Sequence, residues 1–328
     1  MERSSNLISI VAPAFNEGNG LVPYYEEIKK MLDQTFYSFE LIFVNDGSSD
    51  QTLEVLKEIK KSDERIGIIN LSRNFGKENA VKAGLDHARG EAVVVMDADL
   101  EHPPHVLLEM LDQFGKGYDV VFTRAVDRKG QNYIRKKLSS TFYDVINKIA
   151  GDGISFRTGD KDFILLSRKA VNALLDLNEY NRFSKGLFKW IGFNSTEVTF
   201  EQGERLEGES KWSIKKLAHY SIDAITSFSF VPLRFSSYMG MIVSSISFIY
   251  MIYIIVDTIV NGSSVAGFPT LVTLILFLSG VILISLGIMG EYLARIFIEV
   301  KKRPIYLIEE YQPSEEVYNK RTYSESKY

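Results

Sequence analysis

Apolar and polar positions alternate regularly over the first two hundred residues. Five short apolar runs predict strands, and they lie at residues 7–12, 39–44, 66–71, 93–96 and 119–123. Segments with helical spacing separate most of them, so that strands and helices alternate roughly every 25–30 residues. This order predicts βαβ units, an α/β fold and a mostly parallel sheet. Pro13 follows the first run, and because it has no N–H group we expect it to end that strand.

The second half of the chain has a different pattern. The runs 235–256 and 268–290 contain no charged residue. At about 1.5 Å per residue, each could cross a hydrocarbon core of about 30 Å. They predict a two-helix transmembrane hairpin rather than two buried core helices. The expected parts are a soluble domain at 1–212, an amphipathic juxtamembrane segment at 213–234, two transmembrane helices within 235–292 (about 235–258 and 268–290), and a tail at 293–328.

Charge orients this hairpin. Basic residues flank the pair on both outer sides, whereas the linker 261–267 has none. The positive-inside rule therefore predicts a multi-pass plasma-membrane protein whose soluble domain and both termini are cytoplasmic. The net charge of −4 gives no indication of a nucleic-acid partner. The chain has no cysteine, which excludes disulfides and thiolate chemistry.

Acidic segments follow three of the predicted strands. They contain Glu17, Asp46, and the pair Asp97 and Asp99. In a parallel sheet these segments meet at the carboxyl edge, where α/β folds bind ligands. Two close carboxylates repel each other unless a cation lies between them, and hard oxygen ligands suit Mg²⁺ or Mn²⁺ on a substrate diphosphate. Glu101 adds a third carboxylate. Asp-x-Asp alone also occurs as surface acids in a loop or a helix cap.

Two other segments are candidates for chemistry. The basic stretch 124–137 includes Arg124 and Arg135. It is either a solvated helix face or an anion site, since Arg binds phosphate through two parallel hydrogen bonds. Asp160 and Asp162 precede an apolar strand, where a carboxylate can act as a general base or simply cap the strand end. No Gly-x-Gly-x-x-Gly or Gly-Lys-Ser/Thr motif follows a strand, which disfavours dinucleotide-binding and P-loop folds.

Seven motifs in this order and spacing resemble a known family. They lie at residues 11–17 (VAPAFNE), 44–48 (VNDGS), 97–100 (DADL), 162–165 (DFIL), 182–183 (RF), 208–212 (GESKW) and 290–304. The chain resembles the family 2 glycosyltransferases that attach a sugar to a polyisoprenyl phosphate. These are the bacterial undecaprenyl-phosphate glucosyltransferases, which are related to dolichol-phosphate mannose synthase. The resemblance covers residues 7–310.

The resemblance implies a GT-A catalytic domain, an inverting transfer and a divalent cofactor, Mg²⁺ or Mn²⁺. It implies a donor nucleotide sugar, for which UDP-glucose is the first expectation, and an undecaprenyl phosphate acceptor used for cell-envelope glycans. It also favours self-association in the membrane, with a tetramer as the expected form. The rival interpretations are a membrane-tethered glycosyltransferase with a non-lipid acceptor and an inactive scaffold for a flippase.

The resemblance also assigns roles to individual residues. The implied nucleotide site consists of Pro13, Phe15, Glu17, Asp46, Asp97 and Ala98. The implied metal ligands are Asp97, Asp99 and Glu101, where the family commonly has Gln at the last position. Asp162 corresponds to the family's proposed base, with Asp160 as a rival. The implied lipid-phosphate site consists of Arg124, Arg135, Ser139 and Lys211. Two further candidate site residues are Arg182 and Arg205.

Overall fold

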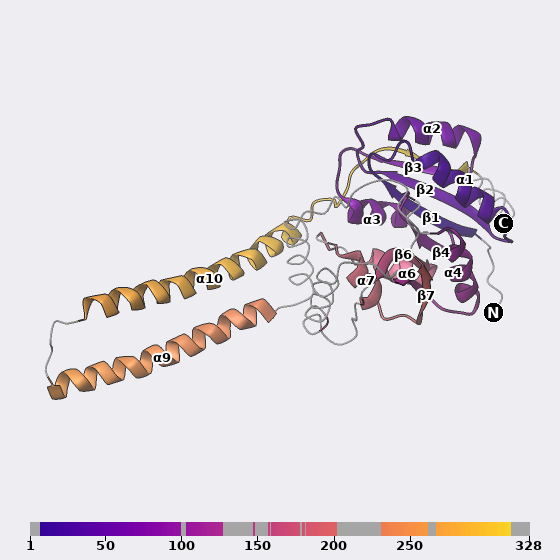
Figure 1. Ribbon diagram of the computed structural model, residues 1–328. Coiled ribbons are helices and arrows are strands. Elements are labelled where there is room, and N and C mark those ends of the chain that lie inside the picture. The colour runs from indigo at the N-terminus through magenta and orange to yellow at the C-terminus, as the bar shows by residue number, and fades with distance from the viewer. Residues whose placement is uncertain are drawn as a thin grey trace, which may run out of the picture.

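The computed structural model shows a globular α/β domain from which two long helices project side by side (Figure 1). The structure describes residues 7–99, 103–126, 147, 157, 159–177, 179–180, 182–201, 231–261 and 267–315. Of the candidate site residues, Glu101, Arg135, Ser139, Arg205 and Lys211 lie outside the described residues. The juxtamembrane segment at 213–234 also lies almost entirely outside them.

The first half of the domain alternates strands and helices as the sequence predicts. In chain order its elements are β1 (Leu7–Ala14), α1 (Leu21–Leu32), β2 (Ser38–Asn45), α2 (Thr52–Ser62), β3 (Ile66–Leu71), α3 (Lys77–His87), β4 (Ala92–Val95) and α4 (His105–Gly115). β1 lies between β2 and β4 and is parallel to both, and β3 is parallel to β2. The predicted α/β fold with parallel βαβ units is therefore confirmed.

The second half extends the sheet on the β4 side. Its elements are β5 (Val120–Val126), β6 (Asp160–Ser167), α6 (Arg168–Leu175), α7 (Ser184–Trp190) and β7 (Ser195–Glu201). The described sheet has the order β7-β5-β6-β4-β1-β2-β3-β8. β6 runs antiparallel to both β4 and β5. Its first residues, Asp160 to Asp162, therefore lie at the edge where β4 ends, which brings them toward Asp97.

Neighbouring residues of each central strand face opposite layers of the core. Ile10 belongs to the layer that α1, α2 and α4 cover, and Val11 belongs to the layer that α3, α6 and α7 cover. Both side chains are fully buried. A Cβ atom on Gly84 of α3 would lie 2.2 Å from Val11 Cγ1, so only glycine allows this close approach. The packing thereby fixes α3, whose first residues lie at the carboxyl edge of the sheet.

The expectation that Pro13 ends the first strand is wrong. β1 continues to Ala14, and Pro13 pairs with Val44 of β2. The register explains why proline is tolerated. Ala14 O accepts a hydrogen bond from Asp46 N, so the backbone polar groups of Ala14 face β2. Those of Pro13 therefore face the opposite side, that of β4. β4 has already ended at Val95, opposite Val11, so no partner on that side needs an N–H group from residue 13.

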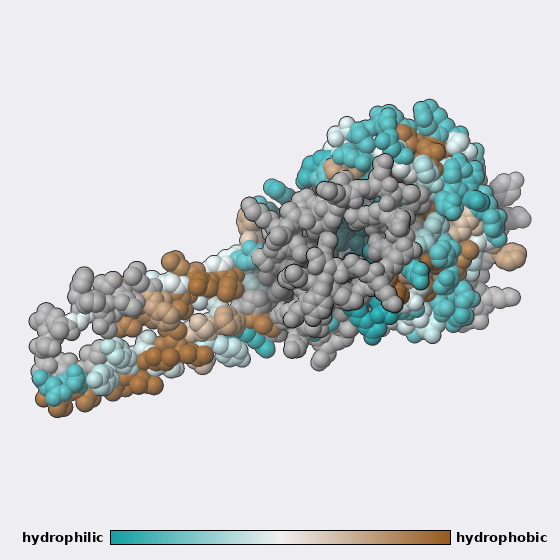
Figure 2. Space-filling view, in the orientation of Figure 1, coloured by the Kyte–Doolittle hydropathy of each residue, from teal (hydrophilic) through white to brown (hydrophobic). Residues whose placement is uncertain are grey.

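The two projecting helices are α9 (Val231–Asn261) and α10 (Phe268–Val300). They run side by side and contact each other (Figure 1). Among the described residues, one stretch, Phe277–Val300, is long and apolar enough to cross a membrane by length and composition. Figure 2 shows apolar side chains gathered on both helices, whereas hydrophilic side chains cover most of the coloured surface of the globular domain. The membrane hairpin and its topology remain predictions.

After α10 the chain returns to the globular domain, which the sequence pattern does not predict. β8 (Ile308–Gln312) adds an antiparallel edge strand to β3. Ser314 Oγ then donates a hydrogen bond of 2.9 Å to the buried Glu40 of β2. Part of the region predicted as a tail is therefore integrated into the sheet, and it ties the end of α10 to the domain.

Candidate active site at the carboxyl edge of the sheet

The loops after β1 and β2 are joined by hydrogen bonds. Asn16 N donates to Ser48 Oγ at 3.0 Å, and Ser49 N donates to Asn16 Oδ1 at 2.9 Å. Asn16 has a φ of 55°, a left-handed conformation that Asn tolerates better than most residues. Glu17 N donates to Thr52 Oγ1 at 3.0 Å. These bonds hold Phe15, which is 46% exposed, at the rim of the edge.

Asp46 anchors a neighbouring turn. Its side chain is buried, and it accepts hydrogen bonds from Phe75 N at 2.7 Å and Gly76 N at 2.9 Å. Burial raises the pKa of Asp46 above its usual value, although these two bonds act in the opposite direction. Gly47 has a φ of 64°, and a Cβ atom there would lie 2.3 Å from the carbonyl carbon of Arg73. The turn after β2 is thus packed against the segment that precedes α3.

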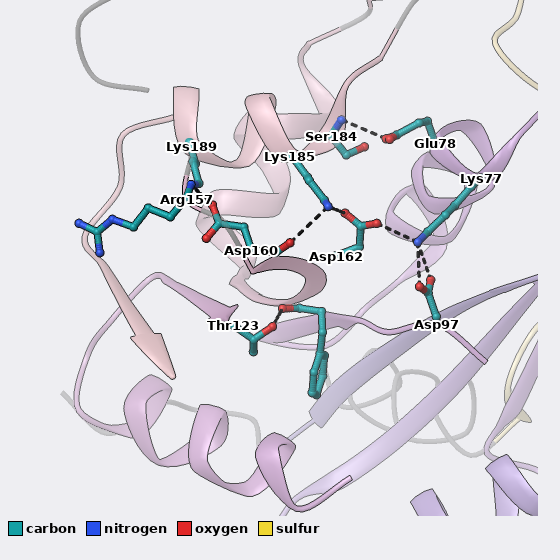
Figure 3. A network of polar contacts seen from close by, with 11 residues as sticks. Lys77, Glu78, Asp97, Thr123, Arg157, Asp160, Asp162, Ser184, Lys185 and Lys189 are labelled. Carbon is teal, nitrogen blue, oxygen red and sulfur yellow. Dashed lines mark hydrogen bonds and ion pairs between the residues drawn. The ribbon is translucent and has the colours of Figure 1, made fainter. Parts of the chain in front are cut away.

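Lys77, at the start of α3, connects two of the predicted site residues (Figure 3). Its ammonium donates to Asp97 Oδ2 at 2.8 Å and to Asp162 Oδ2 at 2.9 Å. Burial lowers the pKa of Lys77, but the two carboxylates outweigh burial and raise it above its usual value. Asp97 comes from the end of β4 and Asp162 from the beginning of β6. The structure thus brings these two acids together with a cation between them, an arrangement that the sequence pattern did not predict.

Two lysines of α7 hold the acids of β6. Lys185 Nζ lies 3.3 Å from Asp162 Oδ1, and Lys189 Nζ lies 2.5 Å from Asp160 Oδ2. Burial raises the pKa of Asp162, but Lys185 and Lys77 outweigh burial and hold it well below its usual range. Asp162 therefore stays ionised near neutral pH and accepts a proton poorly. Asp160 also accepts a hydrogen bond from Arg157 N at 3.0 Å, which ties it to its own loop.

Glu78 places α7 against this cluster. Its Oε2 accepts a hydrogen bond of 3.0 Å from Ser184 N, the first residue of α7. Burial and the nearby Asp162 raise the pKa of Glu78 above its usual value, although the bond from Ser184 lowers it. Consecutive residues of α3 thus contact the end of β4 and the start of α7.

Two predicted arginines lie in other surroundings. Arg124 Nε lies 2.9 Å from Glu197 Oε1 on β7. Arg182 donates to the carbonyl oxygens of Leu177 and Leu174, near the carboxyl end of α6. Burial lowers the pKa of Arg182. The structure therefore gives Arg182 a role in holding a helix end, and it shows no contact of either arginine with Asp162.

Sequence reasoning missed four residues of the cluster, which are Lys77, Glu78, Lys185 and Lys189. One signal was available. Lys185 and Lys189 are four residues apart and share a helix face, and Asp160 and Asp162 are two residues apart and share a strand face. The two lysines can therefore pair with the two aspartates where the helix packs against the strand. Lys77 offers no signal of this kind, because a lysine at a helix start is usually solvated.

The end of β4 suits a divalent ion. Asp97 is about one-quarter exposed and already holds a cation, the Lys77 ammonium. Asp99 is exposed two residues later. Among the described residues, no group of three or more His, Asp or Glu side chains lies close enough together to hold a metal ion. One or two carboxylates are enough for Mg²⁺ or Mn²⁺, because these ions commonly complete their coordination with water and substrate phosphates.

Comparison with known proteins identifies the family of this chain. Residues 9–175 match the family model described as Glycosyl transferase family 2. A putative glycosyltransferase of Bacillus subtilis, CsbB, is 48% identical over 93% of the chain and 92% of its own length. The chain belongs to glycosyl transferase family 2. The protein is therefore an enzyme that transfers sugars, and its mostly parallel sheet is of the GT-A type.

Other relatives of this glycosyltransferase have more specific names. The SfII prophage-derived bactoprenol glucosyl transferase of Shigella flexneri is 40% identical over 92% of the chain and 97% of its own length. Among solved structures, glucosyl-3-phosphoglycerate synthase from Mycobacterium tuberculosis in complex with UDP aligns with a TM-score of 0.45 and 18% identity. That alignment covers 68% of this chain and 78% of the other.

Proposed function

We propose that this glycosyltransferase moves a glucosyl group from UDP-glucose to undecaprenyl phosphate, with inversion at the anomeric carbon. The product is a lipid-linked sugar for modification of cell-envelope glycans. The observation that carries this proposal is the cluster of Asp97, Lys77 and Asp162, which puts paired charges at the edge where a nucleotide diphosphate would bind. The Shigella relative is named a bactoprenol glucosyl transferase, and this chain aligns with nearly its full length. That similarity supports the choice of acceptor and sugar.

The donor would occupy the edge formed by the loops after β1, β2 and β4. Pro13, Phe15, Glu17 and Asp46 would surround the base and ribose, and Asp97 and Ala98 would contact the rest of the nucleotide. Phe15 is exposed at the rim and offers a ring on which a base can stack. The Asp46 carboxylate is already bonded to Phe75 N and Gly76 N. Asp46 therefore supports the proposed nucleotide site by fixing the turn that leads to Lys77.

Asp97, Asp99 and Glu101 would hold Mg²⁺ or Mn²⁺. When bound, the divalent ion supplies positive charge against the leaving nucleotide diphosphate. Lys77 is a positively charged side chain of the protein itself at the same place. Its ammonium lies 2.8 Å from Asp97 and would face the donor phosphates from there. A fixed positive charge at this position stabilises the charge that develops on the leaving group.

The acceptor oxygen belongs to a phosphate that is already ionised near neutral pH, so the reaction needs little base catalysis. Asp162 accordingly positions Lys77 and Lys185 and does not remove a proton, because its pKa is held low. Asp160 positions Lys189 in the same way. The lysines of α7 reduce the repulsion between two anionic substrates as the lipid phosphate attacks the anomeric carbon. The remaining positive charge would come from Arg124, Arg135 and Lys211, with Ser139 donating a hydrogen bond.

The helix pair would hold the catalytic domain against the cytoplasmic face of the bacterial plasma membrane. The exposed apolar surface of α9 and α10 supports this placement. Both termini would be cytoplasmic, and copies of the chain would associate through the membrane helices. A lipid-linked acceptor could then present its phosphate to the carboxyl edge of the sheet without leaving the bilayer.

A transfer assay tests the proposal. Purified full-length protein in detergent would receive undecaprenyl phosphate, Mg²⁺ or Mn²⁺, and one radiolabelled UDP- or GDP-sugar at a time. We expect label to enter the organic phase from UDP-glucose and to require the metal. If label enters the organic phase from another donor, that donor's sugar replaces glucose in the proposal. If no donor gives labelled lipid, the proposed lipid acceptor is contradicted. Asp99→Ala serves as the inactive control, with circular dichroism to show that it folds.

A further inference from the structure

A cavity lies where the end of α10 meets the globular domain. Its volume is about 700 Å³, and its walls come from Lys82 of α3, from Tyr180, from residues 298–299 and from residues 302–306. Tyr180 N donates a hydrogen bond of 2.8 Å to Glu299 Oε1, which fixes α10 to the domain at this point. The cavity begins where the apolar stretch Phe277–Val300 ends. If α10 spans the membrane as proposed above, the cavity lies at the depth of the lipid headgroups.

Two cations, Lys302 and Arg303, line this cavity together with one carboxylate, Glu299, which accepts the hydrogen bond from Tyr180 N. Lys302 and Arg303 are exposed, and neither side chain forms an ion pair or hydrogen bond with any residue that the structure describes. The backbone N–H of Lys302 donates to Glu299 O at 3.1 Å. The neighbouring cations differ: Lys82 Nζ donates to Asp86 Oδ1 at 2.6 Å, and Lys301 Nζ lies 4.0 Å from the centre of the Phe297 ring. Positive charge is therefore available at the mouth of the cavity for an external anion.

The backbone of Lys302 gives an independent indication. Its φ is 47°, the left-handed conformation, and it follows directly after the last turn of α10. Glycine is the usual residue at this place, because a side chain there costs about 1–2 kcal/mol. Lysine at residue 302 thus gives up stability that glycine would provide. Such a residue is most simply explained by a role for its side chain.

We propose that the phosphate of an anionic phospholipid headgroup binds in this cavity, between the side chains of Lys302 and Arg303. Basic residues immediately after a membrane helix attract anionic lipid, and Arg can donate two parallel hydrogen bonds to one phosphate. This site is separate from the proposed lipid acceptor site, which lies at the carboxyl edge of the sheet. It touches the same helix, however, since Lys82 in the cavity wall and Lys77 in the active site both belong to α3.

The test measures binding of spin-labelled phosphatidylglycerol and spin-labelled phosphatidylcholine to the full chain in detergent micelles. We expect phosphatidylglycerol to bind more tightly. Lys302→Gly and Arg303→Gln should each weaken that preference about fivefold, and Lys302→Arg should keep it. Because glycine accepts the backbone conformation, Lys302→Gly should melt no lower than the wild type. Lys61→Gln, which removes an exposed lysine on α2, is the matched control and should change nothing.

Any of three results would overturn the site. One is equal binding of the two lipids. Another is a preference for phosphatidylglycerol that survives the double substitution Lys302→Gly with Arg303→Gln. The third is complete competition by inorganic phosphate at the concentration of the lipid, which would make soluble phosphate the ligand. Flotation with pure phosphatidylcholine vesicles tests the membrane placement separately. A chain that floats without preferring phosphatidylglycerol disproves the site alone, whereas a chain that does not float disproves the placement on which the site rests.

Discussion

Ile10 in β1 is fully buried, whereas Ile249 in α9 is 67% exposed. The contrast extends to the two regions as wholes: the globular domain covers its apolar side chains with two layers of helices, and α9 and α10 leave theirs uncovered. Charges show the opposite distribution, since the domain pairs its charges at the sheet edge and the helices carry few. The comparison teaches that the globular domain buries its own apolar side chains, whereas α9 and α10 leave apolar surface that a membrane would cover if the proposed placement holds. The candidate active site belongs to the globular domain, and under the proposed function the helix pair brings this site to the lipid substrate.

The largest expected effect separates chemistry from membrane attachment. Asp97→Asn should reduce transfer by about a thousandfold or more, because it removes the charge that would hold the divalent ion on the leaving diphosphate. The same variant should float with vesicles like the wild type, since Asp97 is far along the chain from both helices. The assay is label transfer, with flotation beside it. A variant that keeps full transfer would remove Asp97 from the metal site.

The next effect compares the two isoleucines directly. Ile10→Ala should lower the free energy of unfolding of the globular domain by about 2–5 kcal/mol, because it leaves a cavity between packed layers. Ile249→Ala, the matched substitution on an exposed position, should leave that free energy unchanged. Urea unfolding followed by fluorescence of the two tryptophans measures both. Equal destabilisation by the two substitutions would mean that α9 is part of the domain core.

Leu283→Arg addresses the helix pair in the same way. Leu283 in α10 is 68% exposed, and an arginine near the centre of a membrane helix costs about 2.5–3.5 kcal/mol. We expect a clear loss of the membrane-bound fraction in flotation, with transfer to a detergent-solubilised acceptor largely retained. Leu283→Ala is the control. If Leu283→Arg floats as well as the control, α10 does not lie in the bilayer at this position.

The smallest effect concerns a charge pair within the domain. Burial raises the pKa of Asp63, but hydrogen bonds from Arg65 and Tyr25 outweigh burial and hold it below its usual value. A lowered pKa stabilises the fold above the unfolded-state pKa of about 3.9, and this contribution is lost as the pH falls through the folded-state pKa. Asp63→Asn should therefore flatten the loss of stability in acid, measured by urea unfolding between neutral and acid pH. Asp112→Asn in an exposed pair should not.

The sequence allowed the first half of the domain to be predicted closely, since β1 to β4 are apolar runs and Asp97 ends the last of them. Two features could not be predicted. β8 has the sequence Ile-Glu-Glu-Tyr-Gln, which lacks a strong strand pattern, and it forms only because β3 offers an open edge. Lys77 was missed because its role depends on two acids far away in the sequence, brought together by the antiparallel placement of β6.

One measurement tests the central claim most directly. Purified enzyme with its metal and UDP-glucose would receive undecaprenyl phosphate, undecaprenol without the phosphate, or no lipid, and free UDP and labelled lipid would be measured together. The account predicts stoichiometric UDP and glucosyl lipid with undecaprenyl phosphate alone, because the phosphate oxygen is the nucleophile. Equal UDP release with all three, and no labelled lipid, would contradict a lipid-phosphate acceptor.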